Sequence, residues 1–160
     1  MLRQFCTFTG VIVAAVEILL APPASADPQP YPDISRYARV DVEDYQMPFN
    51  PTNKVWFSTP WGLNCGMWDD GSFGCSGDIP GAPPGTTQLA WFSGGSSPKL
   101  STTDRPGFLS GAEQPVLPIG TAIQYHGTTC GTLEDTSLYC SRYWESKFLI
   151  SPTHTRFGPP

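Results

Sequence analysis

The chain has 160 residues, a length that suits one small domain with a real hydrophobic core. Its 14 Asp and Glu outnumber its 9 Lys and Arg, and the net charge of −5 argues against nucleic-acid binding, which needs clustered cations. The 18 Pro and 16 Gly are well above their usual combined share of about 12% and predict a chain rich in turns.

Residues 1–26 have the order of a secretory signal peptide. Arg3 precedes a mostly apolar run from Phe5 to Leu20, and small residues follow up to Ala26. A membrane span is the alternative, but the run is shorter than the roughly 20 apolar residues of a span and contains Glu17. We expect cleavage after Ala26, a secreted or envelope-associated protein, and no stable membrane span in the mature chain.

Residues 27–53 form a second segment, rich in Pro, Asp and Tyr. This composition predicts an extended arm that lies against the following domain. The short alternating run Tyr37–Val42 is the one place in the arm where we expect an edge strand. The prolines that punctuate the arm are Pro28, Pro30, Pro32, Pro48 and Pro51.

Residues 54–160 have the pattern of an all-β domain. Short β-rich runs are bounded by Gly, Pro, Asp or Ser, and no window keeps apolar residues at helical spacing. We expect a small antiparallel sandwich or barrel without a helix of any length, and a long loop or irregular edge over Ser93–Pro106. The runs that predict strands are Lys54–Ser58, Leu63–Trp68, Ser72–Ser76, Thr87–Phe92, Thr121–His126, Ser137–Ser141 and Lys147–Ser151.

Four of the five cysteines lie in the predicted mature chain, an even number that is typical of two disulfides in an exported protein. They occur in two copies of the pattern C-G-x-x-x-D-x-S-x-x-C-S. One copy begins at Cys65 and the other at Cys130. The centre of each copy, around Asp70 or Asp135, has the residues of a hairpin turn.

A three-residue loop at that centre places the two cysteines of each copy opposite each other. Opposed Cα atoms in an antiparallel pair are about 4.5 Å apart, within the range that disulfides accept. We therefore predict the bridges Cys65–Cys75 and Cys130–Cys140, with bridges between the hairpins as the alternative. A redox-active pair or a metal site fits the nine-residue spacing poorly.

The chain contains residue types used in catalysis, but none lies in a recognised motif. Ser76 follows a cysteine of the repeat, while His126 and His154 lie at a predicted strand end and in the tail. Acidic residues that could act in glycoside hydrolysis mostly occupy predicted hairpin tips, where they are ordinary turn formers. We expect no metal and no cofactor. These acidic residues are Asp69, Asp70, Asp78, Glu134 and Asp135.

Five tryptophans are the remaining candidates for a site. Most aromatic rings of a small β domain belong to its core. Trp61, beside a Pro-Gly turn, and Trp68, near a hairpin tip, are the two most expected at the surface. They are the candidate ligand-binding residues, for a glycan or a lipid chain.

The string F-S-T-P-W-G-L-N-C, from Phe57 to Cys65, resembles a feature of small exported actinobacterial proteins, especially mycobacterial ones, that carry F-x-[ST]-P-x-G before a cysteine. The resemblance spans Val55–Pro152 and includes C-S-G-D-I-P-G, T-T-C-G and F-L-I-S-P. It implies export and disulfides. It supplies no catalytic residues, because the family is functionally uncharacterised.

The sequence therefore favours a non-catalytic binding module whose partner is an envelope component or an extracellular protein. A glycan- or lipid-binding domain that uses exposed Trp is a close variant. An extracellular hydrolase acting on envelope glycan is the alternative from another class.

Overall fold

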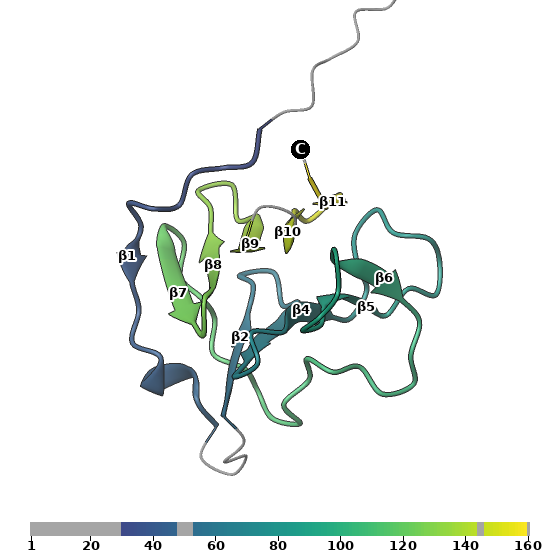
Figure 1. Ribbon diagram of the computed structural model, residues 1–160, viewed down its shortest axis with the longest axis horizontal. Helices are drawn as coiled ribbons and strands as arrows, with labels where there is room; N and C mark the ends of the chain where they lie inside the picture. The colour runs from purple at the N-terminus through teal and green to yellow at the C-terminus, as the bar shows by residue number, and fades with distance from the viewer. Residues whose placement is uncertain (1–29, 48–52, 144–145, 160) are drawn as a thin grey trace, which may run out of the picture.

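The computed structural model describes residues 30–47, 53–143 and 146–159, so the predicted signal peptide lies outside the described residues. Two β-sheets pack face to face, as Figure 1 shows, which confirms the predicted all-β class and makes the domain a sandwich. The described chain has one helical element, the three-residue 3-10 helix η1 (Glu43–Tyr45).

One sheet, sheet B, is a five-stranded antiparallel meander in which each strand pairs with the next. Its last strand falls inside the stretch that the sequence predicted to be a loop or an irregular edge. The strands are β2 (Lys54–Ser58), β3 (Asn64–Trp68), β4 (Phe73–Ser76), β5 (Gln88–Trp91) and β6 (Lys99–Ser101).

The other sheet, sheet A, has the order β1-β7-β8-β9-β10-β11. Five strands form a second antiparallel meander, and β1 pairs parallel to β7 at its edge. The expected edge strand Tyr37–Val42 is present as the two residues of β1. The strands are β1 (Ala38–Arg39), β7 (Thr121–Tyr125), β8 (Thr128–Thr132), β9 (Leu138–Arg142), β10 (Ser146–Ile150) and β11 (Thr155–Phe157).

The two meanders repeat one structural plan. In sheet B, Cys65 of β3 lies opposite Cys75 of β4, and in sheet A, Cys130 of β8 lies opposite Cys140 of β9. The cysteine repeat in the sequence is therefore the central hairpin of each sheet.

Both predicted disulfides are confirmed. Cys65 is bonded to Cys75 and Cys130 to Cys140, and the Cα atoms of each pair are 4.0 Å apart. All four cysteines point between the sheets, where they belong to the main core. Each disulfide thus closes a hairpin and also fills the interior.

The turn residues of the repeat hold each hairpin loop closed. A carboxylate oxygen of Asp70 accepts a hydrogen bond from the Ser72 backbone N–H at 2.8 Å. The Asp135 carboxylate does the same for Ser137 at 3.0 Å. The residue between has a positive φ in both loops, +84° at Gly71 and +68° at Thr136, which is the left-handed position of a three-residue hairpin loop.

The central strands of each sheet are covered on their outer face as well. Phe108, from the crossover between the sheets, packs on Gly66 and Gly74 of sheet B, where a Cβ atom would lie 3.4 and 2.6 Å from its ring. On sheet A, Ile34 of the arm packs over Gly131, the repeat partner of Gly66. The glycines keep both outer faces flat enough to be covered closely.

Replacement of Gly74 by Ala should destabilise the fold. The new Cβ would lie 2.5 Å from the carbonyl oxygen of Leu89 and 2.6 Å from the ring of Phe108. We expect the free energy of unfolding to fall by about 1–3 kcal/mol, the usual cost of overpacking. Denaturant unfolding measures it, with Gly131→Ala as the matched control, because that Cβ would meet mainly the flexible end of Ile34 at 3.0 Å. Equal costs at the two positions would contradict the packing argument.

Loss of one disulfide should cost a large part of the stability. For Cys65→Ala combined with Cys75→Ala, loop entropy alone predicts a loss of about 2.5–3 kcal/mol. Chemical denaturation with and without a reductant measures it. The control is the reduced wild type. It should lose more unfolding free energy than the oxidised variant loses, because reduction opens both disulfides and the substitution removes one. A wild type whose unfolding midpoint does not respond to reduction would contradict the expected contribution.

Candidate functional site

The first candidate site is a pocket of about 380 Å³ at one end of the sandwich, which contains the predicted binding residue Trp61. Its lining combines apolar and polar groups from the β2–β3 and β4–β5 connections and from the turn before β11. The lining residues are Trp61, Gly62, Leu63, Asn64, Ser76, Gly77, Asp78, Pro80, Leu109 and Pro152.

Trp61 is half-buried and held in one orientation. Its indole N–H donates a hydrogen bond to the backbone carbonyl of Thr136 at 3.1 Å. Trp61 lies in the β2–β3 connection of sheet B and Thr136 in the β8–β9 loop of sheet A, so this hydrogen bond joins loops of the two sheets. The ring is therefore fixed before any ligand arrives.

The polar groups of this pocket are an amide and a carboxylate. Asn64 begins β3 and is half-buried, and Asp78 is exposed in the loop after β4. The hydroxyl of Ser76 is engaged in the fold, since it accepts a hydrogen bond from the Phe108 N–H at 3.1 Å. The side chains of Asn64 and Asp78 thus supply the donors and acceptors at the pocket rim.

Trp68, the second predicted binding residue, lies outside this pocket. It ends β3, while Trp61 precedes that strand, so the two rings are at opposite ends of it. Its ring stacks on Phe108 at a centroid distance of 5.4 Å, and the Lys54 ammonium lies 4.4 Å from its centroid. Trp68 therefore belongs to the aromatic cover of sheet B, and the structure does not unite the two tryptophans in one site.

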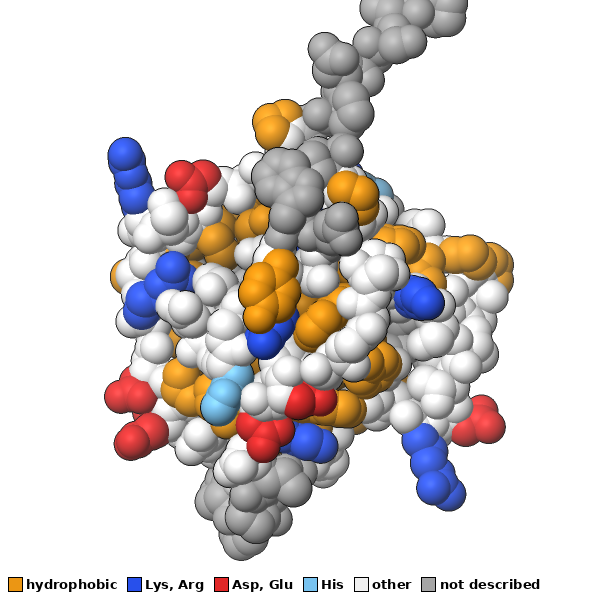
Figure 2. Space-filling model, in the orientation of Figure 1, with side chains coloured by type: hydrophobic (Ala, Val, Ile, Leu, Met, Phe, Trp, Pro, Cys, Tyr) orange, Lys and Arg blue, Asp and Glu red, His pale blue; other side chains and the backbone are white. Residues whose placement is uncertain are grey.

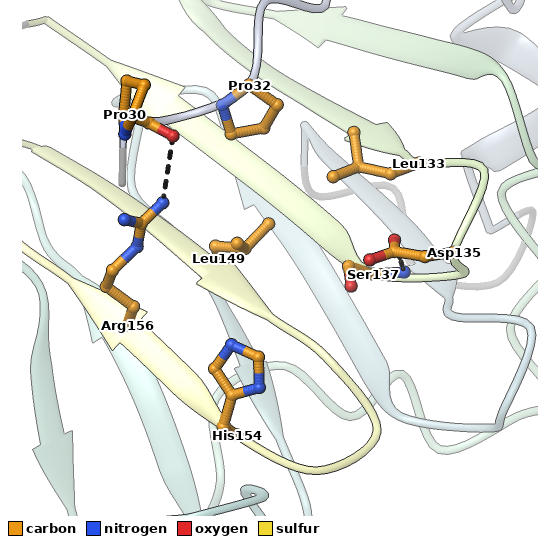
Figure 3. A pocket seen from close by; sticks show the side chains of 8 residues that line it. All are labelled: Pro30, Pro32, Leu133, Asp135, Ser137, Leu149, His154 and Arg156. Carbon is orange, nitrogen blue, oxygen red and sulfur yellow. Dashed lines mark hydrogen bonds between the residues drawn. The ribbon is translucent and has the colours of Figure 1, made fainter. Parts of the chain in front are cut away.

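A second pocket, of about 440 Å³, lies on the outer side of sheet A. Figure 3 shows the arm prolines along one side, with Arg156 and His154 from the β10–β11 region and Asp135 from the β8–β9 loop around them. Chain segments that are far apart in sequence meet here. The lining residues are Pro30, Pro32, Leu133, Asp135, Ser137, Leu149, His154 and Arg156.

Tyr31, between the two arm prolines, attaches the arm beside this pocket. Its ring stacks on Tyr139 at 5.5 Å, and the Arg156 guanidinium and Lys147 ammonium lie 4.2 and 4.8 Å from its centroid. Arg156 also donates to the Pro30 carbonyl at 3.4 Å. Burial raises the pKa of the Tyr31 phenol above its ordinary value, and Arg156 opposes this shift.

Sequence reasoning missed the second pocket. Its walls come from the arm, from the β8–β9 hairpin and from β10 and β11, and no local pattern relates these segments. The P-Q-P-Y-P string of the arm is the signal that could have found it, because prolines around an aromatic residue are typical of an extended docking segment.

The catalytic candidates from the sequence have structural partners. Ser76 is buried, and the His126 ring packs edge to face on the Tyr125 ring with their centroids 4.4 Å apart. His154 lines the second pocket with its Nδ1 2.7 Å from the Ser151 hydroxyl. These three side chains belong to separate parts of the sandwich and share no hydrogen bond in the described residues.

The acidic candidates are also spread over the molecule. Asp70 and Asp135 cap their turns, Asp69 accepts a hydrogen bond from the Asn53 amide at 3.2 Å, and Asp78 lines the first pocket. The described part of the chain holds no group of three or more His, Cys, Asp or Glu that could hold a metal ion. It also contains no helix that could span a membrane.

Charge is distributed without a basic patch on the face in Figure 2, where the blue side chains are separated by neutral and acidic ones.

Comparisons with protein-family models, curated proteins and solved structures gave no significant match.

The raised pKa of Tyr31 predicts that arm docking weakens in alkali. Ionisation of the Tyr31 phenol is harder in the docked arm than in the unfolded chain. The stability that the docked Tyr31 contributes is therefore complete below the ordinary tyrosine pKa of 10.0 and is lost as the pH rises through the raised pKa of Tyr31 in the folded protein. The thermal midpoint should fall more for the wild type than for Tyr31→Phe between about pH 9 and about pH 11. Absorbance at 295 nm follows the phenolate, and identical pH profiles for the two proteins would contradict this account.

Proposed function

We propose that this protein is an exported, non-catalytic binding domain that takes up a carbohydrate chain of the cell envelope in the Trp61 pocket. The observation that carries the proposal is the lining of that pocket. A fixed indole ring and apolar side chains lie beside an amide and a carboxylate in a space of about 380 Å³.

This combination of groups matches the chemistry of a sugar ring. One face of a pyranose presents C–H groups that pack on an aromatic surface, while its hydroxyl groups both donate and accept hydrogen bonds. Asn64 can do both, and the Asp78 carboxylate accepts. The volume is within the range of small-molecule sites.

Preorganisation supports the same reading. The hydrogen bond between the Trp61 indole and the Thr136 carbonyl holds the ring without a ligand, so binding costs little side-chain entropy. The Cys65–Cys75 bridge closes the hairpin that carries Asn64 and Ser76 at its base. Disulfides are compatible with an oxidising compartment outside the cytoplasm, as the signal peptide and the resemblance to small exported actinobacterial proteins suggest.

The proposal is tested by binding of the exported chain to envelope polysaccharide fractions and to a glycan array, followed by calorimetry with the best oligosaccharide. Asn64→Ala and Asp78→Ala should each weaken binding, and Trp61→Ala should weaken it by about tenfold or more, a change of 1.4 kcal/mol. Tyr143→Ala is the matched control, because Tyr143 is an aromatic residue that is 76% exposed and does not line the pocket.

Trp61→Ala also removes a hydrogen bond that supports the fold, so unfolding curves of each variant accompany the binding data. Unchanged affinity in all three pocket variants would remove the Trp61 pocket as the site. Release of reducing sugar ends from a bound polysaccharide, lost in Asp78→Asn, would instead favour the hydrolase alternative.

A further inference from the structure

Sheet A has one strand more than the structural repeat requires. Sheet B is complete with five antiparallel strands, and the equivalent meander of sheet A is β7–β11. The sixth strand, β1, comes from the arm and is the one parallel strand among the named strands of the described chain. In Figure 1 the arm runs down the outer side of sheet A to reach this edge. The arm therefore adds a parallel strand to the edge of an antiparallel meander, as a peptide does in strand addition.

The surface that receives the arm recognises specific side chains. Tyr31 stacks on Tyr139 beneath the cations of Arg156 and Lys147, and Ile34 fills the flat place above Gly131. Further along the arm, the backbone of β1 pairs with β7, and the Val40 N–H donates a hydrogen bond to the Ala122 carbonyl at 3.1 Å. We call residues 30–40 the docking segment and the surface under it, from β7 to β11, the docking face.

Release of the docking segment would leave the main core in place. The cluster around Ile34 contains Ala122 and Tyr139 on the outer side of sheet A and is separate from the cluster between the sheets. Val40, at the end of the segment, is partly buried against the cluster between the sheets, so it is the one residue of the segment whose release removes a contact to the main core. Tyr45, after the segment, is buried in the main core and its hydroxyl donates to the Val116 carbonyl at 3.3 Å. The chain therefore has a fixed point at η1 and a separable segment before it.

We propose that the docking face also binds the docking segment of a second copy of this protein, so that two chains exchange their arms. The docking face of one copy is complementary to the docking segment of another because the two chains have the same sequence. A face that fits residues 30–40 of its own chain also fits residues 30–40 of a second copy. Pivoting before η1, eleven extended residues reach about 36 Å, enough to lie across a neighbouring sheet A. A reciprocal exchange is a closed twofold assembly in which neither docking face is left without a segment.

The cis contact competes with exchange. A segment on a short tether has an effective concentration of the order of millimolar, so we expect a monomer in dilute solution. Exchange becomes populated where copies are concentrated, as for chains bound side by side on one carbohydrate polymer. The proposal itself does not depend on the carbohydrate site.

Complementation between two variants tests the exchange. The first variant, Tyr31→Ala with Ile34→Ala, has a defective docking segment and an intact face. The second, Tyr139→Ala, has an intact segment and a defective face. A third chain carries all three changes and serves as the matched control, because it can neither give nor receive a segment.

Sedimentation velocity and light scattering of the full exported chains give the readout. The first and second variants should each be monomeric alone and form a one-to-one dimer when mixed, with a dissociation constant at least about tenfold below that of either alone. The third chain should form no dimer with the first variant. A synthetic peptide of residues 30–40 should compete with the mixed dimer, and the peptide with Tyr31→Ala should not.

Absence of a mixed dimer at concentrations approaching about 1 mM would overturn the proposal. Peptide binding to the first variant without a mixed dimer would overturn the exchange between copies as well and would point to a proline-tyrosine segment of another protein. Unfolding transitions confirm that each variant is folded. If Tyr139→Ala does not fold, Arg156→Gln replaces it, since it removes the cation over Tyr31 and keeps the stacked ring.

Discussion

The fold depends on one constraint, that the central strands of both sheets are buried on both faces. The inner faces pack on each other around the two disulfides, which belong to the same apolar cluster as the strands. The outer faces have no further sheet to cover them. Irregular segments cover them instead, with Phe108 on sheet B and the arm on sheet A.

Both pockets lie where this covering is incomplete. One is at the end of the sandwich beside Trp61, whose indole joins the two sheets through Thr136. The other is the gap between the arm and the β10–β11 hairpin, next to Tyr31. A small domain with two-sided sheets can thus offer binding surfaces without a groove in its core. The surfaces are built by loops and by the arm, while the disulfide-closed hairpins beneath them stay fixed.

The structural repeat explains why two sites of different character arise from one plan. Gly66 and Gly131 are equivalent in the two sheets, yet one is covered by an aromatic ring of the crossover and the other by an aliphatic residue of the arm. A cover supplied from within the chain, as at Phe108, is tied at both ends. The arm continues into η1 at one end and contacts sheet A along residues 30–40, and this is the cover that we propose to be exchanged.

The sequence by itself determined most strands of the meanders, both disulfides and the two hairpin turns that they close, because these rest on local alternation, cysteine spacing and the Asp-x-Ser turn. It did not determine β6 or β11, whose places at the sheet edges depend on pairing with β5 and β10. It also grouped Trp61 with Trp68 as surface rings, and only the tertiary structure separated them, since burial depends on distant residues such as Phe108 and Thr136. The arm's docking face was decided in the same way, by contacts between residues that lie from 82 to 126 positions apart, such as Val40 with Ala122 and Pro30 with Arg156, which no local pattern encodes.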